Sequence, residues 1–147
     1  MKLVDTEETV VLVTGTTLTA EERDRPIAYQ LKAEIDRRGA GHAYRRAVVV
    51  GDQWYLENRI FHLNPTIAIG GPGVNGVSGD FVPALPTVLN LDERVFVQAD
   101  FEGDQKRAVL WGMDAHATVA AVEAFVRRGM LDDLLGRIWK FRSETFV

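Results

Sequence analysis

Four short apolar runs, each closed by a glycine, predict the strands of a parallel sheet. The segments between them carry apolar residues at helical spacing. A strand that is apolar on both faces is typical of a sheet covered by helices on both sides. The four strands end at Val13-Thr14-Gly15, Val50-Gly51-Asp52, Ile69-Gly70-Gly71 and Trp111-Gly112-Met113.

The first long helix is predicted from an apolar stripe over residues 27–35. Its end is marked by Arg37-Arg38-Gly39, two cations followed by a glycine. Proline is poorly tolerated deep inside a helix, so Pro26 belongs in the first turn. We therefore expect the main helix to begin near Asp24 or Arg25.

Residues 94–100 predict a fifth strand, joined to the strand at 107–111 by a hairpin loop at 102–104. The two strands are then antiparallel to each other. Asp114 is a suitable cap for the helix that follows, and Arg127-Arg128-Gly129 ends that helix.

The pattern predicts one α/β domain spanning residues 1–147, of three-layer Rossmann-like or flavodoxin-like type. Its sheet has about five strands, mostly parallel, with one antiparallel edge strand. Residues 53–64 are rich in aromatic side chains and are compatible with a short helix packed on the sheet. Residues 75–85 favour a weak helix or a structured loop, because their glycines and proline lower helix propensity.

Parallel strands bring their carboxyl ends to one edge of the sheet, where open α/β sheets bind ligands. Glycines and hydroxyls ahead of helices favour a small anionic or nucleotide-like ligand, or a partner. No dinucleotide fingerprint or P-loop is present. The alternative is that the glycines only turn the chain. The candidate ligand-binding residues are Gly15, Thr16, Thr17, Asp52, Gly70, Gly71, Gly73 and Asn75.

A catalytic alternative places acid–base chemistry at the same edge. Asp52, Asp114 and His116, beside Asn75, are the candidates for a small hydrolase or transferase. The competing interpretation makes His116 a solvent-facing residue in the first turn of a helix. The three histidines stand in separate segments without metal-ligand spacing, so no metal site is expected. The sequence does not identify a cofactor.

Composition narrows the choice of partners. The chain has 147 residues, a formal net charge of −4 and a pI of about 5.4, which disfavours a nucleic-acid surface. The absence of cysteine excludes disulfides and thiolate catalysis. No apolar run approaches the length of a membrane span, so a membrane protein is not expected.

The two ends of the chain suggest a compartment and an oligomer. Residues 1–9 are acidic and do not resemble a secretory signal, so the expected location is the cytoplasm of a prokaryote-like cell. The segment Trp139 to Val147 carries several large apolar residues. We expect this tail to dock on the body of the protein or on a second copy, which would form a homodimer.

Two segments resemble a pattern found in archaeal surface-layer proteins. In residues 66–75 a hydrophobic strand runs into Gly-Gly-Pro-x-x-Asn, and in residues 108–125 a strand is followed by Gly-x-Asp and an alanine-rich helix containing a threonine. The resemblance covers less than half of the chain. It implies a Rossmann-like module used in assembly or binding, and it carries over no catalytic residue. The chain departs from the family in having no visible signal peptide.

Overall fold

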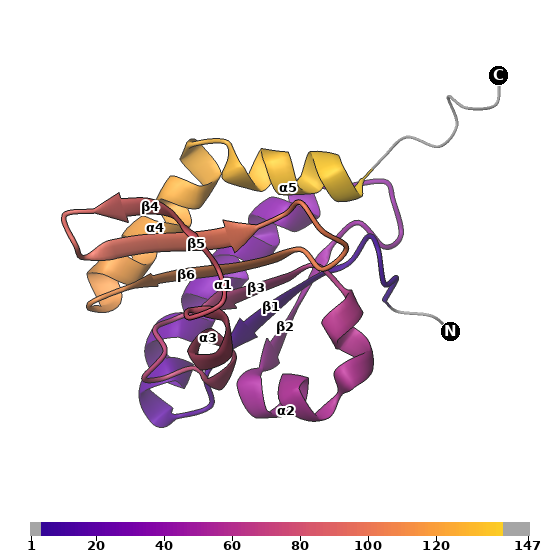
Figure 1. The fold of residues 1–147 in the computed structure, drawn as a ribbon. Helices are drawn as coiled ribbons and strands as arrows, with labels where there is room; N and C mark the ends of the chain where they lie inside the picture. The colour runs from indigo at the N-terminus through magenta and orange to yellow at the C-terminus, as the bar shows by residue number, and fades with distance from the viewer. Residues whose placement is uncertain (1–3, 140–147) are drawn as a thin grey trace, which may run out of the picture.

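The computed structural model describes residues 4–139, which form one mixed sheet with helices on both faces (Figure 1). The strands are β1 (Val10–Thr14), β2 (Ala47–Gly51), β3 (Thr66–Ile69), β4 (Thr87–Leu91), β5 (Val95–Asp100) and β6 (Arg107–Gly112). The helices are α1 (Leu18–Arg38), α2 (Asp52–Glu57), α3 (Gly76–Phe81), α4 (Ala115–Arg127) and α5 (Met130–Ile138), with a 3-10 helix η1 at Arg59–Leu63.

The sheet has the strand order β2-β1-β3-β6-β5-β4. The four strands that end in glycine turns, β1, β2, β3 and β6, are mutually parallel, as predicted. β5 is antiparallel to β6, and β4 is antiparallel to β5. The α/β class with an antiparallel edge is therefore confirmed. The expected count of about five strands is wrong, since β4 adds a sixth.

β4 was not predicted from the sequence, because the turn that follows it contains neither glycine nor proline. The chain reverses after it through Asp92 and Glu93, which have φ values of 55° and 57°. Two such left-handed positions in a hairpin usually hold asparagine or aspartate followed by glycine, and here Glu93 stands in the place of the glycine. The strand itself lies at the edge of the sheet with Thr87 and Val88 exposed, so its pattern does not look like that of a core strand.

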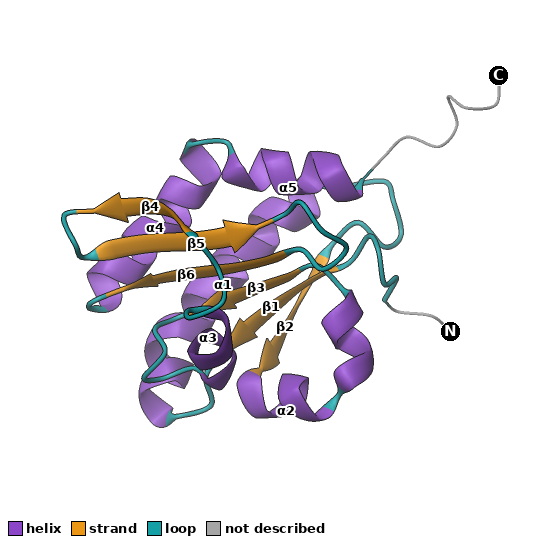
Figure 2. Ribbon diagram, in the orientation of Figure 1, coloured by secondary structure: helices purple, strands orange, loops and turns teal. Residues whose placement is uncertain are grey.

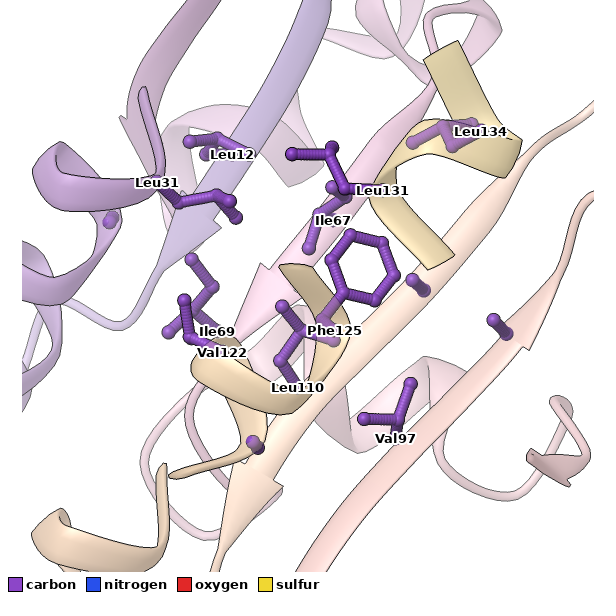
Figure 3. Packing of buried hydrophobic residues seen from close by; sticks show 14 of the residues in the cluster. Leu12, Leu31, Ile67, Ile69, Val97, Leu110, Val122, Phe125, Leu131 and Leu134 are labelled. Carbon is purple, nitrogen blue, oxygen red and sulfur yellow. The ribbon is translucent and has the colours of Figure 1, made fainter. Parts of the chain in front are cut away.

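The alternation of side chains along β1 divides the core into two layers. Val10 and Leu12 face α1, α4 and α5, whereas Val11 and Val13 face α2 and α3. Figure 2 shows the helices on either side of the strands. In the larger layer, Phe125 of α4 lies close to side chains from the strands and from α5 (Figure 3). The short helical segments in residues 53–64 match the expectation for that stretch.

α1 begins earlier than predicted. Its cap is Thr17, whose hydroxyl accepts a hydrogen bond from the backbone N–H of Ala20 at 3.2 Å, and the helix continues through Pro26. The proline removes one main-chain bond, but the buried residues that follow it in α1 pack on the sheet and hold the helix. As a result Asp24 lies inside a continuous helix, not at its start.

The predicted homodimer concerns the tail at residues 139–147, of which residues 140–147 lie outside the described residues. The last described residue, Trp139, donates its indole N–H to the carbonyl of Glu8 at 2.7 Å. Within residues 4–139, no helix is both long and apolar enough to cross a bilayer.

Candidate functional site

The carboxyl ends of β1, β2, β3 and β6 lie at the same edge of the sheet (Figure 1). The segments that follow them form two groups, and the segment after β3 belongs to both. One group is a hydrogen-bonded junction between the segments that follow β1, β2 and β3. The other group borders an open cleft between α1, the loop after β3 and the start of α4.

Asp52 is the centre of the junction. Its Oδ1 accepts hydrogen bonds from the Thr16 hydroxyl at 2.9 Å and from the backbone of Gln53 at 2.8 Å. Its Oδ2 accepts a bond from the N–H of Gly76 at 2.8 Å. The side chain is buried. Asp52 therefore ties three segments together, which accounts for an acidic residue at this position without a ligand.

Asn75 is a second residue whose side chain joins neighbouring elements of the junction by hydrogen bonds. Its Nδ2 donates to the carbonyls of Val13 and Ile69, both at 3.0 Å. Its Oδ1 accepts from the N–H groups of Val77 and Ser78, the first turn of α3. All of these bonds are buried, so the Asn75 side chain joins the ends of β1 and β3 and caps α3.

Two more candidate residues have structural roles. Thr17 caps α1. Gly15 packs against the backbone of the loop after β3, where an added Cβ would lie 1.8 Å from the carbonyl oxygen of Val74. No side chain fits there, and Gly15 needs to be glycine for this close approach. Thr16 and Thr17 are exposed but do not border the cleft.

The cleft has a volume of about 340 Å³. Gly71 and Gly73 border it, so two of the predicted ligand-binding glycines face an open space. Its other walls come from α1, from the end of β6 and from the first turns of α4. The remaining lining residues are Thr19, Arg23, Asp24, Pro72, Val74, Trp111, Gly112, Met113, Asp114, Ala115 and Thr118.

Asp24 is the most unusual residue of the cleft. The residue is only 6% exposed and borders the cleft, yet its carboxylate accepts no hydrogen bond from any described residue. Burial raises the pKa of Asp24 to about 6, and the positive charge of Arg23 opposes this rise. A buried carboxylate without a partner costs free energy, so natural proteins usually supply one.

Gly70 makes room for that carboxylate. Its φ is +107°, a conformation that residues with a side chain rarely adopt. A Cβ at this position would lie 2.5 Å from Oδ2 of Asp24. The glycine predicted to line a ligand site thus forms the surface against which Asp24 packs.

The three predicted catalytic residues share no hydrogen bond. Asp114 caps α4 by accepting the N–H of Ala117 at 2.8 Å, and this bond, with help from Arg94, keeps the pKa of Asp114 below its usual range. Asp114 also forms an ion pair with Arg94. His116 is exposed and borders a second depression, which Asp114 also borders, so the structure brings these two predicted residues near each other but not near Asp52. The contacts of Asp52 all belong to the junction.

Within residues 4–139, no group of three or more His, Asp or Glu side chains is placed to hold a metal ion. The cleft nevertheless contains two charged residues, Arg23 and Asp24, that were not among the predicted site residues. A signal for Asp24 exists in the sequence. It precedes Ile27 and Leu31 at spacings of three and seven, which places a carboxylate on the apolar face of a helix.

Neither a protein-family model nor a curated protein sequence matches this chain. The resemblance to archaeal surface-layer modules is therefore untested and stays a prediction.

Proposed function

We propose that this protein is a non-catalytic binding domain that holds a small polar ligand in the cleft between α1, the 71–74 loop and the start of α4. The single observation that carries the proposal is Asp24. This residue is buried in the wall of an open cleft, and no described residue donates a hydrogen bond to it. A fold tolerates such a group where a ligand supplies the missing donor.

The topology supports the same location. β1 lies between β2 and β3 in the sheet. From β1 the chain passes through α1 to β2, toward one end of the sheet, and from β3 it passes through α3 to β4, at the other end. α1 packs on one face and α3 on the other. In Rossmann-like and flavodoxin-like sheets, this reversal of strand order opens a crevice at the carboxyl ends of the strands. The cleft is bordered by α1 and by the loop after β3, the two segments that diverge there.

The composition of the walls refines the ligand predicted from sequence. A purely anionic ligand is disfavoured, because Asp24 and Asp114 both border the cleft. The volume is at the lower end of the usual range for small-molecule sites, which favours a compact ligand.

Filling the cleft is expected to abolish binding without unfolding the protein. Gly73 borders the cleft and has open space where a Cβ would lie, so we expect the indole of Gly73→Trp to occupy part of the cleft without backbone strain. Gly103, in the β5–β6 loop, also has open space around it, so Gly103→Trp is the matched control.

The measurement is a titration of ¹⁵N-labelled protein with inorganic phosphate, AMP, glucose, L-leucine and L-phenylalanine, followed by amide shifts in NMR. At least one probe should move the amides of Gly71, Gly73 and Gly112 in the wild type and in Gly103→Trp, but not in Gly73→Trp. If none of these probes moves the cleft amides, or if Gly73→Trp binds as the wild type does, the proposed function is wrong.

A small hydrolase or transferase is the second candidate, and the observation that favours it is the same carboxyl group. A carboxyl group with a pKa of about 6 at a cleft is suited to proton transfer near neutral pH. The acid–base residue of such an enzyme would be Asp24, in place of Asp52, Asp114 or His116. Chemical conversion of a bound probe, lost in Asp24→Asn, would favour the enzyme over the binding domain.

A further inference from the structure

The cleft carries two side chains of opposite charge, and neither has a partner among residues 4–139. Asp24 lies in the wall and accepts no hydrogen bond. Arg23 is exposed at the border of the cleft and forms no ion pair with a described residue. Most arginines of α1 differ in this respect, since Arg25, Arg37 and Arg38 all pair with carboxylates.

Arg23 and Asp24 do not neutralise each other by direct contact. Consecutive residues of a helix point about 100° apart, so their side chains do not face each other. No ion pair joins them, although the charge of Arg23 acts on Asp24 through space. The two groups therefore offer two separate charged contacts at one opening, one within the wall and one at the border.

The rest of the lining is largely apolar. Pro72, Val74, Trp111 and Met113 border the cleft together with two threonines. The hydroxyl of Thr118 already donates to the carbonyl of Asp114 at 3.2 Å. A matching ligand then has an apolar part, a cationic donor for the buried carboxylate and an anionic group for the guanidinium.

We propose that the occupant is a small zwitterion of the amino-acid type, whose ammonium group donates to Asp24 and whose carboxylate binds Arg23. The proposal rests on the proposed function, since it assumes that the cleft is a binding site. An ammonium group is favoured over a neutral hydroxyl because a hydrogen bond between two ionised groups is stronger than one from a neutral donor. A phosphate ester is disfavoured because its second negative charge would face Asp24 and Asp114.

The experiment compares probes that differ by one charge. L-leucine and L-phenylalanine carry both charges, their N-acetyl derivatives lack the ammonium group, and their amides lack the carboxylate. Each is titrated into ¹⁵N-labelled protein, with the amides of Gly71, Gly73 and Gly112 as reporters. The variants are Asp24→Asn, Arg23→Gln and Glu22→Gln. Glu22 is an exposed carboxylate on the same helix that does not border the cleft, so Glu22→Gln is the matched control.

The free amino acids should bind, and acetylation of the amine or Asp24→Asn should each weaken binding roughly tenfold or more. The two changes should not add, because both remove the same contact. Loss of the ligand's carboxylate, as in the amino-acid amides, and Arg23→Gln should each weaken binding as well. These two changes should not add either, because both remove the contact with Arg23. Glu22→Gln should bind as the wild type does, and a dispersed spectrum of each variant verifies that it is folded.

Three results would overturn the inference. In the first, phosphate, AMP or glucose binds at the cleft and the amino acids do not, which would leave the proposed function standing. In the second, the N-acetyl derivatives bind as tightly as the free amino acids. In the third, no probe moves the reporter amides, which would contradict the proposed function as well.

Discussion

Replacing Asn75 by aspartate is expected to lower the free energy of unfolding by about 3–5 kcal/mol. The substitution keeps the shape of the side chain but exchanges the Nδ2 donor for an oxygen. That oxygen would face the carbonyls of Val13 and Ile69, which lie 3.0 Å from Nδ2. The site is fully buried, so neither water nor another described residue can relieve the repulsion between these oxygens.

Urea denaturation of the purified variant measures this loss. Asn90→Asp is the control, because Asn90 is exposed and its hydrogen bonds go to Glu93 in the adjacent turn. The control should lose less than about 1 kcal/mol. A variant at position 75 within about 1 kcal/mol of the wild type would show that Asn75 does not hold the ends of β1 and β3 together.

The opposite effect is expected at Asp24, where replacement by asparagine should stabilise the protein. A pKa raised from 3.8 to about 6 corresponds to a cost of about 3 kcal/mol when the group is ionised. Asparagine has nearly the same shape and carries no charge, so it escapes most of this cost. We expect a gain of about 1–3 kcal/mol at about pH 8.

The effect of Asp24→Asn on stability should depend on pH. Between about pH 4 and pH 6 the folded wild-type protein keeps a proton on Asp24 that the unfolded chain releases, so its stability falls as pH rises. Below about pH 4 the carboxyl group is neutral in both states and the cost disappears. The advantage of Asp24→Asn should therefore vanish near pH 4 and reach its full size above about pH 6.

Thermal or urea unfolding of wild type and variant at several pH values tests this expectation, with Glu22→Gln as the control for removal of an exposed charge. The control should change stability by less than about 0.5 kcal/mol at every pH. A loss of stability in Asp24→Asn at about pH 8 would mean that the carboxylate has favourable partners in the folded protein. A gain in stability joined to a loss of ligand binding is the pattern expected of a residue retained for function.

The sheet could be predicted from sequence because the signals for it are local. Each of the four parallel strands is an apolar run that a glycine ends, and Asp114 caps α4 as expected. β4 could not be predicted in this way. It is an exposed edge strand, and the turn that pairs it with β5 has Glu93, rather than glycine, in a left-handed conformation.

The site was predictable only at the level of its location. The edge of the sheet followed from parallel strands, but residue type alone could not distinguish a ligand-binding group from a structural one. Asp52 and Asn75 have side chains suited to ligands, yet their hydrogen-bonding groups are used within the fold. Long-range contacts determine this, since Asn75 bonds to a carbonyl 62 residues away.

Asp24 was missed for a specific reason. The usual effect of Pro26 on helices placed the predicted start of α1 at Asp24 or Arg25, and an aspartate at a helix start needs no further explanation. Once α1 begins at Leu18, Asp24 shares the buried face of the helix with Ile27 and Leu31. A carboxylate on that face needs a hydrogen-bond donor, and the open cleft beside it is where a ligand could supply one.

The fold leaves the carboxylate of Asp24 without a hydrogen-bond donor among the described residues, and the titration of this group in solution measures the consequence. The ¹³C resonance of the Asp24 carboxyl group, assigned by comparison with Asp24→Asn, is followed across the pH range in the ligand-free protein. We predict a midpoint of about 6. A midpoint at or below about 4, the ordinary value for aspartate, would show that the carboxylate is solvated or hydrogen-bonded within the protein and would contradict the role proposed for Asp24.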